Sequence, residues 1–68
     1  MKYGDVLRVR RALLRMNQTL TAKRARISFN RYWRIENDLA EPTADELARI
    51  AKALRSTASD LFSEQVSA

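Results

Sequence analysis

The 68-residue sequence contains neither cysteine nor histidine. Disulfide bonds are therefore excluded, and a structural zinc site would lack its usual thiolate and imidazole ligands. The commonest enzymatic pairs of nucleophile and base also need one of these two residues. We therefore expect no metal, no cofactor and no catalytic residues, and we expect that the protein is not an enzyme.

Glycine and proline occur once each, and this scarcity favours helices over a β-rich or disordered chain. No apolar run approaches the roughly 20 residues of a membrane span, and no signal peptide is visible, so we expect a cytoplasmic protein without membrane contact. A chain of this length allows one domain with one small core. We predict a single all-α domain over residues 1–68, with a core at about 5–63 and a frayed tail at 64–68.

The net charge of +5 is unevenly distributed along the chain. Residues 1–17 and residues 18–37 each carry five Lys/Arg and one acid, whereas residues 38–68 carry three Lys/Arg and six acids. This division fits a face that binds a polyanion and a second face for other contacts. By charge alone, a generally basic soluble protein fits about as well.

Five helices are predicted from capping residues and apolar spacing. Asn17 and Ser28 are suitable N-caps for the second and third helices, and Thr43 with Glu46 forms a capping box for the fourth. The apolar residues of the fourth helix recur at the spacing of one helix face. The predicted ranges are 5–15, 18–25, 29–37, 44–54 and a short helix after Thr57 that ends near Phe62 or Ser63.

Neighbouring aromatic residues divide the third predicted helix into two faces. Tyr32 and Ile35 stand three positions apart, so both should point into the core, with the Tyr32 hydroxyl reaching its edge. Trp33 is then left at the rim of the other face, where partial packing is the simpler expectation. Arg8, on the first predicted helix, is expected to be a solvated charge.

Residues 18–37, QTLTAKRARISFNRYWRIEN, have the pattern of two short helices joined by a tight turn. Several further residues and short motifs stand at fixed distances from one another over about residues 6–62. They are Asn17-Gln18, Ala22, Ile27-Ser28, Arg34–Asn37, Pro42, Ile50–Leu54 and Asp60–Phe62. Through them the chain resembles the Cro/CI repressor family, also called the XRE family. The resemblance implies a compact five-helix, lambda-repressor-like domain with a helix-turn-helix at its second and third helices.

The resemblance also implies that the second helix of this motif enters the DNA major groove. The implied base-contacting residues are Ser28, Phe29, Asn30 and Arg34. The amide of Asn30 suits adenine and the guanidinium of Arg34 suits guanine, while Phe29 suits a thymine methyl group or packs against the preceding helix. The implied phosphate contacts are Asn17, Gln18, Lys23, Arg26 and Arg31. Among these, Asn17 also suits capping, and Lys23 equally suits a solvated charge.

Two further relationships are implied by the family. Arg11 and Glu36 occupy the positions of a partly buried salt bridge that orients the recognition helix, and the alternative is two exposed side chains. Two-fold dimers place their recognition helices about 34 Å apart on a near-palindromic site, so a homodimer is expected. The candidate dimer residues are Ala58, Leu61 and Phe62, although the core of the monomer must claim Leu61 or Phe62.

Some positions depart from the family pattern. Four places where relatives often have glycine hold Arg15, Arg26, Asp38 and Arg55. If Arg26 adopts the left-handed conformation in the turn, it costs about 1 kcal/mol relative to glycine. Thr21 stands where a core leucine is usual, so we expect either a slightly rotated second helix or an exposed Leu20. The loop at 38–41 is acidic, so we assign no phosphate contact to its side chains.

The resemblance implies a sequence-specific regulator that binds double-stranded DNA. The simplest such protein is a dimeric repressor of phage, plasmid or prophage type, which blocks polymerase by occupying a near-palindromic operator. The alternative is a protein-interaction module, such as an antitoxin that binds a toxin partner and autoregulates its operon. RNA binding is less favoured, because the aromatic residues here lie on a helix rather than on a sheet platform.

Overall fold

The computed structural model describes residues 3–67, apart from the side chains of residue 62 and residues 64–67. Within these residues the chain forms five helices and no strand, as the sequence predicts. They are α1 (Gly4–Leu14), α2 (Gln18–Arg24), α3 (Phe29–Glu36), α4 (Ala44–Ala53) and α5 (Ala58–Ser67). The first four begin and end within one residue of their predicted bounds.

The predicted end of the fifth helix is wrong. The chain was expected to leave the helix near residue 62 or 63 and to continue as a frayed tail, but α5 continues to Ser67. Ala68, the last residue of the predicted tail, lies outside the described residues. No capping or breaking residue follows Phe62, so local sequence contains no signal that would end the helix there.

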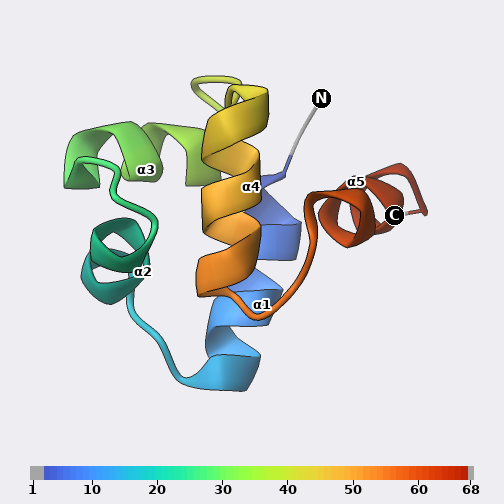
Figure 1. Cartoon of the computed structure of the whole chain (residues 1–68), viewed down its shortest axis with the longest axis horizontal. Helices are drawn as coiled ribbons and strands as arrows, with labels where there is room; N and C mark the ends of the chain where they lie inside the picture. The colour runs from blue at the N-terminus through green and yellow to red at the C-terminus, as the bar shows by residue number, and fades with distance from the viewer. Residues whose placement is uncertain (1–2, 68) are drawn as a thin grey trace.

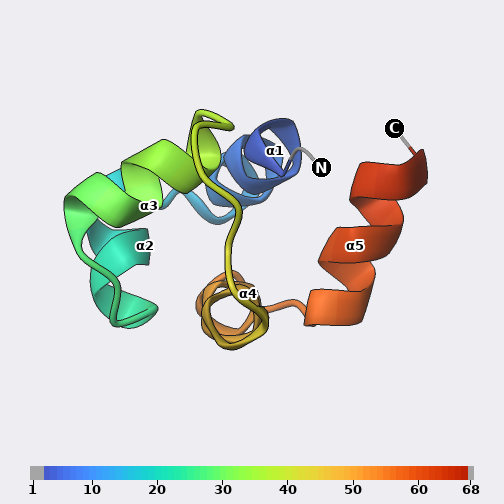
Figure 2. The ribbon, with the colours of Figure 1, turned by 90° about the horizontal axis from the view of Figure 1, so that it is seen from above.

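The helices surround one core, with α2 and α3 on one side of the molecule and α5 on the other (Figure 1). Between them lies α4, which contacts both α2 and α5. Viewed from above, α1 lies beside α3, and α5 is well separated from α2 and α3 (Figure 2). Because α1 and α2 both pack against α3, one side of α3 is buried and the other remains at the surface.

Side-chain caps determine where three of the helices begin. Asn17 Oδ1 accepts a hydrogen bond of 2.8 Å from the backbone N–H three residues later, and Ser28 Oγ accepts one of 3.2 Å in the same way. Thr43 and Glu46 form the predicted capping box, with bonds of 3.1 and 2.9 Å. These three predictions are confirmed, and each cap satisfies an N–H group that has no partner inside its helix.

The core is built mainly from aliphatic side chains around one aromatic ring. Its buried hydrophobic residues are Tyr3, Leu7, Met16, Ala22, Ala25, Tyr32, Ile35, Ile50, Ala51, Leu54 and Leu61. Tyr32 and Ile35 are buried as predicted. Tyr3 lies before the first predicted helix, yet it is only 4% exposed. Val9 and Leu13, in contrast, are 59% and 75% exposed, so the apolar residues of α1 are not all used by the core.

Thr21 fills its core position without the usual leucine. The residue is completely buried, and its hydroxyl donates a hydrogen bond of 2.9 Å to the carbonyl oxygen of Asn17. A buried hydroxyl that is bonded to the preceding turn avoids the free-energy cost of an unsatisfied polar group. Leu20 is partly buried against the core, so of the two alternatives predicted for this position, an exposed Leu20 is excluded.

Four non-glycine residues adopt positive φ angles. They are Arg15 (54°), Arg26 (59°), Asp38 (60°) and Arg55 (54°). The left-handed conformation expected at Arg26 is thus confirmed, and it also occurs at the other three positions where the family pattern has glycine. Each such residue costs about 1 kcal/mol relative to glycine, because its Cβ approaches the following carbonyl oxygen. The four turns therefore adopt the left-handed conformation although none of these residues is glycine.

Candidate nucleic-acid interface

The surface side of α3 presents four side chains next to one another. They are Phe29, Asn30, Trp33 and Arg34. Phe29 and Trp33 are four positions apart, as are Asn30 and Arg34, so the members of each pair share one side of the helix. Tyr32, Ile35 and Glu36 on the opposite side are buried. Phe29 is 45% exposed and Trp33 is 41% exposed. Two polar and two aromatic side chains are therefore available on α3 for contact with a partner.

Asn30 and Arg34 are the polar members of this surface. Within residues 3–67 neither side chain takes part in a hydrogen bond or ion pair, so their polar groups face solvent. Ser28 differs, because its Oγ already accepts the N-cap bond of α3, although the hydroxyl hydrogen can still be donated. An amide and a guanidinium in these positions match the acceptor and donor pattern of purine edges.

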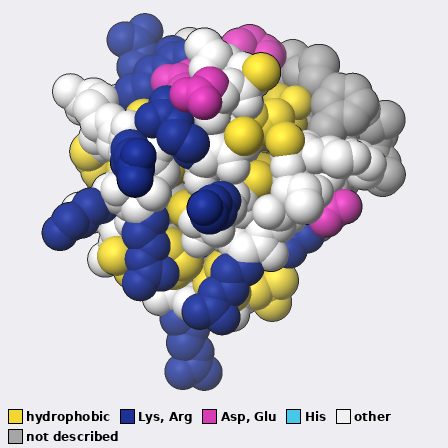
Figure 3. All heavy atoms as spheres, in the orientation of Figure 1, with side chains coloured by type: hydrophobic (Ala, Val, Ile, Leu, Met, Phe, Trp, Pro, Cys, Tyr) yellow, Lys and Arg dark blue, Asp and Glu magenta, His cyan; other side chains and the backbone are white. Residues whose placement is uncertain are grey.

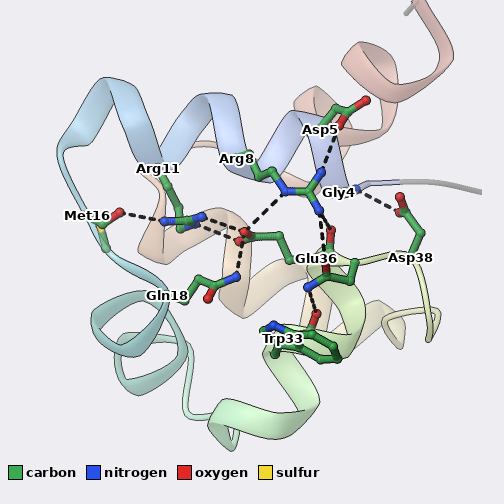
Figure 4. A network of polar contacts seen from close by, with 10 residues as sticks. Gly4, Asp5, Arg8, Arg11, Met16, Gln18, Trp33, Glu36 and Asp38 are labelled. Carbon is green, nitrogen blue, oxygen red and sulfur yellow. Dashed lines mark hydrogen bonds and ion pairs between the residues drawn. The ribbon is translucent and has the colours of Figure 1, made fainter.

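The buried side of α3 is fastened to α1 by Glu36 and Arg11 (Figure 4). Arg11 Nε donates to Glu36 Oε2 at 2.8 Å, and Arg11 Nη2 donates to Glu36 Oε1 at 2.6 Å. Glu36 is completely buried, and the Arg11 side chain is 18% exposed. The structure thus contains the partly buried salt bridge that the family resemblance implies. Its two-pronged geometry fixes the orientation of the C-terminal end of α3 against α1.

Two more residues join this ion pair (Figure 4). Gln18 is a predicted phosphate contact, but its side-chain amide donates a hydrogen bond of 2.9 Å to Glu36 Oε1. Arg8 donates to the backbone carbonyl of Glu36 at 3.0 Å, and its Nε lies 3.8 Å from Glu36 Oε1. The prediction of a solvated Arg8 is therefore wrong. The signal that could have placed it is its spacing of three residues from Arg11, which puts both on one side of α1.

The pKa of Glu36 results from two opposed effects. Burial raises it, because a buried carboxylate loses its hydration. The hydrogen bonds donated by Arg11 and Gln18 act in the other direction and prevail, so the pKa of Glu36 lies below its ordinary value. Glu36 is therefore an ionised carboxylate at neutral pH, and the nearby arginines compensate its charge.

The hydroxyl of Tyr32 does not reach the edge of the core, which contradicts the prediction. Tyr32 is completely buried, and its hydroxyl has no hydrogen-bond partner among the described residues. The physical reason is the close packing of both α1 and α2 on this side of α3. Burial raises the pKa of Tyr32 above its ordinary value, so the hydroxyl stays neutral.

Arg31, one of the predicted phosphate contacts, connects α3 with α4. Its Nε donates to Glu46 Oε2 at 3.0 Å, and its Nη2 donates to Glu46 Oε1 at 2.8 Å. The same Nη2 donates to the carbonyl oxygen of Glu41 at 2.8 Å. The bonds from Arg31 lower the pKa of Glu46 to about 2. Arg31 thus positions α3, because its guanidinium is engaged within the protein.

The other predicted phosphate contacts lie at the start of α2 and at its C-terminal end. Asn17 caps α2 through its side-chain oxygen, which leaves the amide N–H groups available. Lys23 and Arg26 are exposed, and within the described part of the chain neither side chain has a hydrogen-bond or ion-pair partner. These three residues can therefore still donate to an anion beside α3.

The candidate dimer residues are only partly available. Leu61 is completely buried in the core of the monomer, so the prediction that it contacts a second copy is wrong. A side chain that the monomer's own core encloses cannot be offered to a partner at the same time. Ala58 is partly buried, and the side chain of Phe62 lies outside the described residues.

A model of the helix-turn-helix family matches residues 7–61. The chain belongs to the helix-turn-helix family. The matched region begins at Leu7 and ends at Leu61, both of which are completely buried. It therefore contains nearly the whole core of this helix-turn-helix protein, together with α2, α3 and α4.

A solved structure has the same fold. It is the solution structure of the DNA-binding domain of the P22 C2 repressor, with a TM-score of 0.85 and 26% identity, over 91% of this chain and 82% of that chain. Together with the family match, this similarity confirms the resemblance to the Cro/CI family. The comparison with curated proteins gives no match.

No described helix is long and apolar enough to cross a membrane. Among the same residues, no group of three or more His, Cys, Asp or Glu side chains could hold a metal ion. The side chains of Lys23, Arg26, Asn30 and Arg34, on α2, in the turn after it and on α3, form no hydrogen bond or ion pair within the described residues.

The sequence analysis missed one close approach that supports α3. Gly4 N donates a hydrogen bond of 3.1 Å to Asp38 Oδ1, so the start of α1 is attached to the turn after α3. A Cβ atom at Gly4 would lie 2.2 Å from the carbonyl oxygen of Glu36. The one glycine of the sequence thus lies where the backbone of α1 closely approaches the end of α3. The rarity of glycine in this sequence is the signal that could have drawn attention to it.

Proposed function

We propose that this helix-turn-helix protein is a DNA-binding transcription regulator, and that it represses by occupying a specific operator. In this proposal α3 enters the major groove, Asn30 and Arg34 contact base edges, and Ser28 and Phe29 contact the groove beside them. The similarity to the DNA-binding domain of the P22 C2 repressor supports this function, and the repressor in that name supports repression over activation.

The observation that carries the proposal is the exposed pair Asn30 and Arg34 on a helix whose opposite side is fixed to the core. The two residues are four positions apart, which is about 6 Å along a helix. Neighbouring base pairs are about 3.4 Å apart along DNA, so the two side chains can contact bases within about two steps of each other. The ion pair of Arg11 and Glu36 supports this role by holding α3 in one orientation.

Phosphate contacts would place α3 in its register on the duplex. We assign them to Asn17, Lys23 and Arg26, whose polar groups face solvent near α3. Gln18 and Arg31 contribute indirectly, because their donors are bonded to Glu36 and Glu46. Contacts of this kind strengthen binding to any sequence and carry no base information themselves.

Two copies are needed for an operator longer than one half-site. The backbone of one copy measures 27 × 23 × 18 Å, and it presents a single α3. One turn of DNA is about 34 Å, so we propose a two-fold dimer on a near-palindromic operator with its recognition helices about that far apart. Because Leu61 belongs to the core, the contact between copies is placed at exposed surface near Ala58, at the start of α5.

The test is a titration with DNA from upstream of the protein's own gene and with shuffled DNA of equal length. Trp33 is the only tryptophan and lies on α3, so its fluorescence reports binding without a label. We expect the upstream DNA to bind more tightly and to keep that advantage at higher salt, since non-specific binding weakens steeply with salt. Asn30→Ala and Arg34→Ala should each remove about 1–3 kcal/mol of this discrimination.

Lys23→Ala is the matched control, because a phosphate contact contributes equally to both DNAs. It should weaken both and leave their ratio unchanged. Equal binding of the two DNAs by the unchanged protein, fading together with salt, would contradict autoregulation by specific repression. That result would favour an antitoxin-like role in binding a protein partner, for which the exposed Val9 and Leu13, one turn apart on α1, offer apolar surface.

A further inference from the structure

A hollow of about 490 Å³ lies between the C-terminal ends of α2 and α4. Its described lining consists of Arg24, Arg26, Arg49, Lys52, Ala53 and Arg55. All of these except Ala53 are cations, and none belongs to α3. Lys and Arg side chains gather over this face of the molecule, across α2 and the C-terminal end of α4, whereas acidic side chains lie toward its edges (Figure 3).

The charge of the hollow is largely uncompensated. Among residues 3–67, no acidic residue lines the hollow. One acidic residue, Asp45, forms an ion pair with the lining residue Arg49, with 3.2 Å between Asp45 Oδ2 and Arg49 Nε. Arg49 Nη1 also donates a hydrogen bond of 3.1 Å to the carbonyl oxygen of Arg26. The C-termini of α2 and α4 add about half a negative charge each, which offsets only part of five cations. Clustered charges of one sign in a concave surface focus the potential and attract a counter-ion.

Two lining residues adopt a conformation that glycine would adopt more easily. Arg26 and Arg55 have φ angles of 59° and 54°. In the described part of the chain neither side chain forms a bond that would offset this strain. Asp38, also left-handed, differs because its carboxylate accepts a hydrogen bond from Gly4 N. The backbone strain of these two residues is therefore not offset by a bond of their own side chains.

We propose that this hollow binds an oligophosphate anion, namely the triphosphate group of a free small molecule. Four of its five cations are arginines, whose planar guanidinium groups donate two parallel hydrogen bonds to phosphate oxygens. Its volume lies in the range of about 300–1,000 Å³ that is usual for small-molecule sites. The described lining contains no aromatic ring on which a base could stack. Recognition is therefore directed at the phosphate chain.

The anion is a free molecule because most cations of the hollow lie away from the exposed side of α3; Arg26, to which we also assign a phosphate contact, is shared between the two surfaces. Three of the five cations lie on α4 or directly after it. The ion pair of Arg31 and Glu46 joins α3 to the first turn of α4. The C-terminal end of α4 lies at the other end of that helix, away from α3 (Figure 1). A duplex with α3 in its major groove therefore has its backbone beside α2 and α3, and the end of α4 is left open to solvent. The inference does not depend on which operator the protein recognises.

The test uses sodium tripolyphosphate as the ligand, titrated calorimetrically at about 0.15 M salt, where charges further apart than about 8 Å are screened. Sulfate at matched ionic strength is the control ligand. Two variants remove lining cations: the single variant Arg55→Gly, and the double variant that combines it with Lys52→Gln. Since Arg55→Gly also relieves backbone strain, we do not expect either variant to lose its fold. Arg15→Gly is the matched control, because Arg15 is left-handed too, with φ 54°, but does not line the hollow.

We expect tripolyphosphate to bind more tightly than sulfate. Its affinity should fall about fivefold for each cation removed, because losing one exposed ion pair costs about 1 kcal/mol of binding free energy. Arg15→Gly should bind as the unchanged protein does, and all variants should keep the same DNA affinity and salt dependence. Equal affinities for tripolyphosphate and sulfate, or no loss in the double variant, would overturn the proposal. A weaker, less salt-dependent DNA affinity in the double variant would also overturn it, because the occupant would then be the DNA backbone.

Discussion

Arg11 on α1 and Glu36 at the end of α3 form a two-pronged ion pair, with hydrogen bonds of 2.8 and 2.6 Å, although 25 residues separate them in the sequence. The carboxylate is completely buried, whereas the guanidinium keeps some contact with water. The pair therefore ties the orientation of the recognition helix to the helix that precedes the motif. Gln18 adds a third bond to the same carboxylate and so brings the start of α2 into the arrangement.

Removal of Arg11 should destabilise the protein strongly. Arg11→Ala leaves a buried carboxylate without its main partner, and the expected loss is about 3 kcal/mol of unfolding free energy. Arg11→Lys is the matched control, since it keeps the charge but cannot form both hydrogen bonds, and its loss should be smaller. Urea unfolding at pH 7 measures both. An Arg11→Ala variant as stable as the lysine variant would show that the charge of Glu36 is compensated elsewhere.

Acid should destabilise the protein through Glu46 and Glu36. The folded pKa of each lies below its ordinary value, and that of Glu46 lies near 2 instead of 4.5. The unfolded chain therefore binds more protons, and the stability that these groups contribute is present above about pH 4.5 and is lost as the pH falls toward 2. Urea unfolding at a series of pH values should show this decline. Glu46→Gln should decline less steeply, and an unchanged slope would contradict the assignment to Glu46.

Arg15→Gly should stabilise the protein. Arg15 follows α1 with φ 54°, and its backbone N–H donates to the carbonyl oxygens of Ala12 and Arg11 in the closing turn. Glycine adopts this conformation without the Cβ contact, so we expect a gain of about 1 kcal/mol. In a domain of this size that gain raises the melting temperature by about 4–8 °C. Arg15→Ala keeps the Cβ and should give no such gain in stability. If the two variants were stabilised equally, the gain would come from removing the arginine charge rather than from relieving the backbone.

Gly4→Ala should destabilise the protein, although alanine normally favours a helix over glycine by about 1 kcal/mol. The added Cβ would lie 2.2 Å from the carbonyl oxygen of Glu36 and 2.9 Å from Asp38 Oδ2. The first of these atoms is backbone and cannot move alone, so α1 must shift away from α3 at a cost of about 1–3 kcal/mol. Thermal unfolding tests this. A melting temperature that rises would mean that the two helices are not in close contact at Gly4.

The sequence by itself determined the features that depend on residues within about four positions of one another. The caps at Asn17, Ser28 and Thr43 each bond to an N–H three residues later, and the starts of α2, α3 and α4 follow from them. The family resemblance also predicted the left-handed conformation of Arg26, and it marked Arg15, Asp38 and Arg55 as positions where relatives often have glycine. The exposed side of α3 follows from helical periodicity once Tyr32 and Ile35 are assigned to the core.

Only the tertiary structure decided which distant side chains meet. Arg8, Gln18 and Arg31 look like solvated or anion-binding groups in the sequence, but the packing of α1, α2 and α4 against α3 brings them to Glu36 and Glu46. The packing of α5 against α1 and α4 encloses Leu61, which the sequence left available for a dimer. These outcomes depend on how the helices cross, and no local pattern encodes that.

The charge distribution illustrates the same limit. Along the chain, residues 1–37 are basic and residues 38–68 are acidic. In the fold, however, all three cations of the acidic part, Arg49, Lys52 and Arg55, meet two from the basic part around one hollow. Electrostatic potential depends on distance in space rather than on position in the chain. The sequence therefore determined the helices and the sign of the total charge, and the contact between α2 and α4 determined where that charge is concentrated.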